Sequence, residues 1–88
     1  MKAVISVVGK DSVGILAKVS SACADCSVNI IEVNQSVLRD MFAMLMLAEL
    51  ENDTTIDLLR EKLTEVEKQT STKIHVMHED IFNSMHRI

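Results

Sequence analysis

Aromatic side chains and basic residues are both scarce in this chain of 88 residues. It contains two phenylalanines, no tyrosine and no tryptophan, so it offers few flat surfaces on which nucleic-acid bases could stack. Nine Lys and Arg stand against thirteen Asp and Glu, which gives a formal net charge of −4 at pH 7. Because nucleic-acid binding requires dense positive charge, we expect no nucleic-acid partner.

Membrane-spanning and secretory segments are also missing. No apolar run approaches the roughly 20 residues that cross a bilayer. The apolar run after Lys2 stops at Gly9 without the features of a signal peptide. Two cysteines without an extracellular signal indicate a reducing compartment. Together these features predict a cytoplasmic protein of one domain, with no membrane contact and no linker.

Aliphatic residues dominate what is present. Hydrophobic residues make up 48% of the chain, which is typical of a folded domain. Residues 3–8 form an apolar, β-branched run that predicts an interior strand. A helix should follow, with Asp11 or Ser12 as its N-cap. Its apolar stripe is Ile15, Val19, Ala22, Cys23 and Cys26.

Two more strands, a helix and a fourth strand follow. Residues 28–38 alternate, with Ile31, Val33 and Val37 predicted on one face. A tight reversal at residues 39–40 leads into residues 41–50, which are apolar on both faces. A second amphipathic helix should begin after residues 52–55, and residues 74–78 predict the last strand. The stripe of that helix is Ile56, Leu59, Leu63, Val66 and Thr70.

The order strand-helix-strand-strand-helix-strand predicts an α+β, ferredoxin-like βαββαβ fold. This fold has a four-stranded antiparallel sheet in the order 4-1-3-2, with two helices on one face. The other face would then expose Ala43, Leu45 and Leu47, which is more apolar surface than monomers usually expose. A short amphipathic tail carrying Ile81, Phe82, Met85 and Ile88 could cover part of it. We therefore expect a homodimer or a higher homo-oligomer.

The spacing of Cys23 and Cys26 is a C-x-x-C, which is often a metal or redox site. Both cysteines fall in the last turn of the predicted helix, where the helix dipole opposes a thiolate. We interpret the pair as core packing and keep a metal-binding module as a weaker alternative.

Three histidines near the C-terminus could also suggest a metal site, beside Glu79 or Asp80. His75 and His78 lie three apart on a predicted strand and should point to opposite faces, so with His86 they predict no metal site. Nucleophile–base pairs and a G-x-S-x-G motif are not visible in the sequence. We expect neither an enzyme nor a bound cofactor.

The loop between the first strand and the first helix is the remaining candidate. Gly9 would let the backbone turn and approach a ligand, and the free amides of the following helix could hold a carboxylate. From the residues alone, a plain strand-to-helix turn remains the simpler interpretation.

The segment of residues 8–20, followed by residues 28–30, resembles the ACT domain. The carrying motif is G-x-D-x-x-G-I, starting at Gly9, together with Asn29-Ile30. The resemblance extends over residues 2–79 and leaves residues 80–88 as the tail. More narrowly, the chain is similar to small stand-alone ACT proteins related to the glycine cleavage system repressor.

ACT domains are regulatory modules that bind small ligands, typically amino acids, and usually act as dimers or larger assemblies. The resemblance implies a ligand between the first loop and helix of one copy and a strand of its neighbour. Gly9 and Asp11 would shape the loop, Gly14 would allow close approach and Asn29 would face the ligand. The full set of implied ligand-binding residues is Gly9, Lys10, Asp11, Gly14, Ile15, Asn29, Ile30 and Ile31.

The resemblance thus implies a non-catalytic regulatory module that binds a small ligand at a dimer interface and acts on a partner protein. The alternative from another class is a structural interaction module that binds no ligand.

Overall fold

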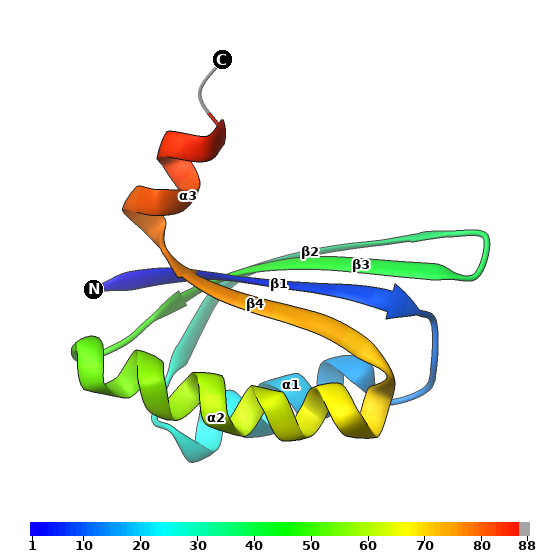
Figure 1. Ribbon diagram of the computed structural model, residues 1–88, viewed down its shortest axis with the longest axis horizontal. Helices are drawn as coiled ribbons and strands as arrows, with labels where there is room; N and C mark the ends of the chain where they lie inside the picture. Colours follow the sequence, from blue (N-terminus) through cyan, green and yellow to red (C-terminus); the bar gives the residue numbers. More distant parts are fainter. Residues whose placement is uncertain (87–88) are drawn as a thin grey trace.

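The computed structural model describes residues 1–86 and shows the predicted order of elements (Figure 1). The strands are β1 (Lys2–Lys10), β2 (Asn29–Leu38), β3 (Met41–Glu49) and β4 (Thr72–His78). The helices are α1 (Ile15–Asp25), α2 (Asp53–Thr70) and α3 (Glu79–His86). Within residues 1–86, no helix combines the length and apolar character needed to span a membrane.

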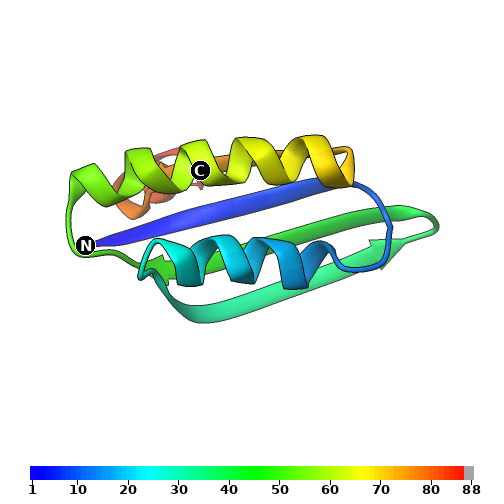
Figure 2. The same ribbon diagram turned by 90° about the horizontal axis from the view of Figure 1, so that it is seen from below.

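The four strands form one antiparallel sheet in the order β2-β3-β1-β4, as predicted. Helices α1 and α2 lie side by side against one face of it (Figure 2). The turn between β2 and β3 is the predicted reversal, with Arg39 at a φ of 61°. Met41 pairs with both Leu38 and Lys10, so this turn lies at the same end of the sheet as the end of β1.

The core lies between the helices and the sheet. Along β3, Met44 and Met46 are buried under the helices while Ala43 and Leu45 are exposed on the other face. This alternation confirms the two predicted faces of the strand. The helices contribute their predicted stripes, of which Val19 and other members are fully buried. At about 25 cal/mol per Å² of apolar surface removed from water, this layer is the main source of stability.

The start of α1 differs from the prediction. Its N-cap is Gly14, in the left-handed conformation at a φ of 87°, and no side chain caps the helix. Asp11 and Ser12 are exposed in the preceding loop. The backbone N–H of Asp11 instead donates a hydrogen bond of 2.7 Å to the carbonyl of Asp40. The turn into α1 needs a left-handed residue immediately before Ile15, and glycine adopts that conformation without strain.

Strand β2 also differs from the expected alternation. A β-bulge between Ile30 and Glu32 leaves Ile31 out of the pairing register. Val33 and Val37 pair with residues of the helix-side face, yet they are 43% and 52% exposed. They remain exposed because β2 is an edge strand, and the β2–β3 turn extends beyond the ends of α1 and α2 (Figures 1 and 2).

Helix α3 rises from the opposite face of the sheet (Figure 1). Its main contacts are with β1 and β4, and its Phe82 is half-buried. Ile81 is 53% exposed. Ile88, and the side chains of Met85 and His86, lie outside the described part of the chain. Phe82 therefore covers one end of this face, as predicted for the tail, whereas the prediction that Ile81 also covers it is wrong because that side chain projects from α3.

The two cysteines occupy different environments. Cys23 is fully buried in the core and Cys26 is half-buried at the C-cap of α1. Burial raises the pKa of the Cys23 thiol from 9.0 to about 11, and the neighbouring Cys26 adds to the rise. Such a thiol is a packing group rather than a nucleophile.

Gly9 lies within β1, and a methyl group there would come within 2.9 Å of the Thr72 Cα and 3.0 Å of the Ser71 carbonyl oxygen. Both are backbone atoms, so trimming the Thr72 side chain would not relieve the clash. We expect Gly9→Ala to lower the free energy of unfolding by about 1–3 kcal/mol, measured by urea denaturation. Thr72→Ser in the same background should not restore it, and an unchanged stability would contradict this account.

Native-state alkylation should separate the two cysteines. The raised pKa lowers the thiolate fraction of Cys23 at pH 8 about 100-fold, and burial blocks access to it. We expect iodoacetamide to modify Cys26 first in the folded protein and both cysteines in urea, as read by peptide mass spectrometry. Equal modification rates in the folded protein would show that Cys23 is accessible.

Candidate ligand site

The loop from the end of β1 to the start of α1 is open to solvent. Asp11, Ser12 and Val13 are exposed, and nothing lies within 4 Å of where a Gly14 side chain would begin. The first backbone amides of α1 point towards this space, because a helix leaves its first N–H groups without intrahelical partners. The loop therefore combines free amides with unfilled room, which suits a small carboxylate.

The hydrogen bond from Asp11 to Asp40 ties this loop to the β2–β3 turn. Lys10 and Arg39 are exposed at the same end of the molecule. Their positive charges lie on the chain segments that flank the loop. A negatively charged group bound near the start of α1 would be attracted by both and repelled by the exposed carboxylates of Asp11 and Asp40 beside them, so the backbone amides of α1 are the main anion-binding groups.

The other predicted residues lie at the opposite end of the sheet. Asn29 pairs with Glu49, which pairs with Lys2. Strand β3 separates this end from Met41, and hence from the loop, by about 26 Å at 3.3 Å per residue. A single chain therefore does not bring Asn29, Ile30 and Ile31 together with residues 9–14.

Two of the predicted ligand-binding residues have structural roles in this chain. Ile15 is 2% exposed and packs in the core. Gly9 has no side chain because β4 approaches too closely, as the Thr72 contact shows. Lys10, Asp11, Asn29 and Ile31 are exposed, while Gly14 and Ile30 are half-buried.

A second hollow, of about 660 Å³, lies between the end of α1 and the outer side of α2. Asp25, Cys26, Leu58, Glu61 and Lys62 are among its lining residues. We did not predict this hollow from the sequence. The signal that could have indicated it is Leu58, an apolar residue one position outside the buried stripe of α2.

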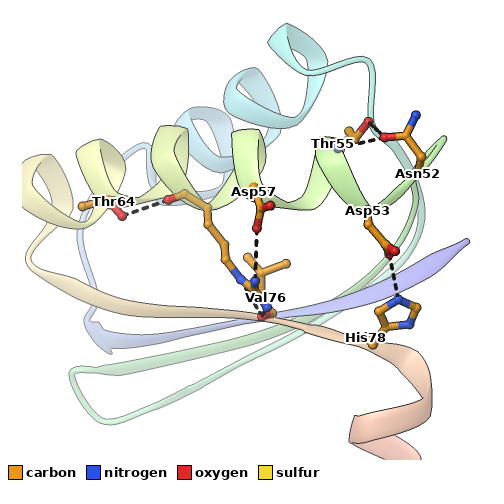
Figure 3. A network of polar contacts seen from close by, with 8 residues as sticks. Asn52, Asp53, Thr55, Asp57, Thr64, Val76 and His78 are labelled. Atoms are coloured by element: carbon orange, nitrogen blue, oxygen red, sulfur yellow. Dashed lines mark hydrogen bonds and ion pairs between the residues drawn. The ribbon is translucent and has the colours of Figure 1, made fainter.

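Polar contacts join α2 to β4 (Figure 3). They involve the arginine and histidine side chains that could otherwise suggest a catalytic or metal site. The Arg60 guanidinium donates to the Val76 carbonyl at 2.9 Å. His78 contacts the Asp53 carboxylate at 3.3 Å on the helix side of the sheet. His75 pairs with Ser6 on the other face, so the two histidines point apart as predicted. Among residues 1–86, no group of three or more His, Cys, Asp and Glu side chains is placed to hold a metal ion.

Comparison with known proteins identifies the same architecture and sequence pattern. The ACT domain family model matches residues 2–77. A UPF0237 protein of Clostridium perfringens is 47% identical over 89 residues, which cover 100% of both chains.

Solved structures of other proteins show the same fold. An ACT domain protein from Streptococcus pneumoniae superposes with a TM-score of 0.80 at 34% identity, covering 93% of each chain. A protein assigned as a glycine cleavage system transcriptional repressor has a TM-score of 0.77 at 23% identity. That match covers 89% of this chain and 47% of the other, and it shows a shared fold. This chain belongs to the ACT domain family, whose members are typically regulatory ligand-binding modules.

Proposed function

We propose that this chain is a non-catalytic regulatory module that binds a small amino-acid ligand between two copies and acts on a partner protein. The observation that carries the proposal is the separation of the two predicted halves of the site. One half lies at the loop and the other at the start of β2, at opposite ends of the same sheet. A second copy is therefore needed to complete it.

The edge strand β2 offers a way to join the halves. It hydrogen-bonds β3 on one side and has no strand on the other within residues 1–86. If two β2 strands pair antiparallel, the Asn29 end of one lies beside the Leu38 end of the other. The backbone hydrogen bond from Asp11 to Asp40 holds the loop next to the Leu38 end. The loop of the second copy would therefore lie near Asn29 of the first. Such pairing would also bury Val33 and Val37, whose side chains are about half exposed.

The groups assembled in this way suit an amino acid. The free amides at the start of α1 and the Lys10 ammonium attract its carboxylate. The Asn29 side-chain carbonyl of the other copy and the Asp11 carboxylate can accept hydrogen bonds from its ammonium group. Exposed Ile31 supplies apolar surface for a side chain.

A structural interaction module without a ligand remains the second candidate, and one observation favours it. Gly9 and Ile15, two positions of the G-x-D-x-x-G-I motif, are explained by packing within the chain. Direct measurement of ligand binding separates the two candidates.

Amino acids should therefore raise the melting temperature of the protein. A ligand at 100 times its Kd stabilises the folded state by about 2.7 kcal/mol. We expect one or a few of the standard amino acids to give such a shift, and Gly14→Val to abolish it by filling the space at the start of α1. Gly14→Ala shares the backbone strain but adds only one methyl group, so it should keep part of the response. No shift with any amino acid would favour the structural module.

A site shared between two copies also predicts complementation. Gly14→Val removes the loop half and Asn29→Ala removes the strand half, so neither variant alone should bind the ligand identified by the thermal shift. After unfolding and refolding together, half of the dimers carry both variants, and each of these has one intact site. We expect calorimetry to recover about a quarter of the wild-type binding capacity. Full binding by Asn29→Ala alone, or none in the mixture, would show that the site is not built this way.

A further inference from the structure

The face of the sheet opposite α1 and α2 is covered at one end only. Near the β2–β3 turn it exposes apolar side chains, among them Leu38 at 76% and Val8 at 45%. Met41, Ala43 and Leu45 continue this exposed area, which we call the open patch. At the other end, α3 lies over Val4 and Leu47, with Phe82 lining a hollow of about 240 Å³ between helix and sheet.

The surface of the chain is larger than that of a compact monomer. It exposes 5775 Å², whereas a monomer of this mass is expected to expose about 5,200 Å². The excess of roughly 600 Å² approaches the 800 Å² that each partner buries in a standard protein interface. This comparison favours an oligomer, and the exposed apolar side chains of the open patch indicate where the partner would pack.

Charge is divided along the same face. Lys73 pairs with Val8, and Lys10 pairs with Met41, so both ammonium groups lie around the open patch. The α3 end carries Glu79 and Asp80 in the first turn of the helix, with Glu32 and Lys2 on the sheet there. His75 lies between the two ends, beside Ser6. Glu49, which pairs with Lys2, lies on the same face, so these lysines and carboxylates give +2 around the open patch and −3 at the α3 end.

We propose that two copies pack through this face, with α3 of each copy lying on the open patch of the other. A twofold axis between the sheets and perpendicular to the strands reverses strand direction, so the acidic end of one copy meets the basic end of its partner. The same axis places β1 and β4 over the partner's β1 and β4. Since α3 contacts those two strands, it comes to lie on Val8 and Lys73.

The exposed side chain that fits this contact is Ile81. A hollow of about 250 Å³ on the open patch is lined by Ser6, Val8, Ala43 and Leu45, among others. Ile81 projects from α3 and is 53% exposed in its own chain. Seated in the partner's hollow, it would leave Glu79 and Asp80 beside Lys73 and Lys10. This interface uses the face of the sheet, whereas the proposed ligand site uses the edge strand β2 and the loop before α1, and only Lys10 is assigned to both.

A designed disulfide tests the contact directly. Within one chain, Val8 lies about 13 Å along β1 from Val4, the residue that α3 covers. In a Cys26→Ser background, Val8→Cys with Ile81→Cys should therefore link two chains under mild oxidation, giving a covalent dimer on a non-reducing gel. The matched control is Leu58→Cys with Ile81→Cys, because Leu58 is similarly exposed on the helix side and should not crosslink efficiently. Equal crosslinking of both pairs, or none of either, would overturn the proposal.

Charge reversal gives a second readout that does not depend on cysteine chemistry. Lys73→Glu should raise the dissociation constant measured by sedimentation equilibrium about fivefold, and adding Asp80→Lys should restore it. Neither substitution lies on β2, so a loss of ligand binding at that edge would leave these results unchanged. A dissociation constant unaffected by Lys73→Glu, or a wild-type chain that stays monomeric, would show that the open patch does not receive α3 of a second copy.

Discussion

The sheet of this protein has two apolar faces, and its two long helices cover only one of them. Met44 and Met46 are buried under α1 and α2, while Leu45 between them points the other way and stays exposed. Side chains alternate along a strand, so a strand with apolar side chains on both faces must be covered on both sides. Helix α3 supplies part of the second cover through Phe82. The remaining apolar area is the physical basis of the proposed self-association.

The order of elements could be predicted because it depends on side-chain periodicity along short stretches. The stripes of α1 and α2 and the two faces of β3 are local patterns, and each is found in the structure. The N-cap of α1 could not be predicted in the same way. Asp11 and Ser12 have good capping side chains, but the turn requires a left-handed residue directly before Ile15, and Gly14 meets that requirement. The bulge at Ile31 likewise depends on pairing with β3 rather than on local sequence.

The candidate site shows a different limit of sequence reasoning. A residue in a motif can serve the fold, the ligand site or both, and the G-x-D-x-x-G-I motif of this chain contains residues with different roles. Gly9 is required by the close approach of β4, and Ile15 packs in the core. Gly14 remains as the position where a missing side chain leaves open space at a helix start. Which residues meet across copies depends on quaternary geometry, because Asn29 and the loop lie at opposite ends of one chain.

The two proposed interfaces are geometrically compatible, since one uses the edge of the sheet and the other its open face. Each reverses the strand direction of the partner, and each is closed by a twofold axis. The edge axis runs perpendicular to the sheet, because paired β2 strands continue one sheet with the helices on the same side. The face axis runs within the plane between two sheets. Perpendicular twofold axes that intersect generate a closed tetramer with dihedral symmetry, which leaves no unpaired edge β2 and no uncovered patch. In such an assembly the outer surfaces of α1 and α2 stay accessible, together with the hollow around Leu58.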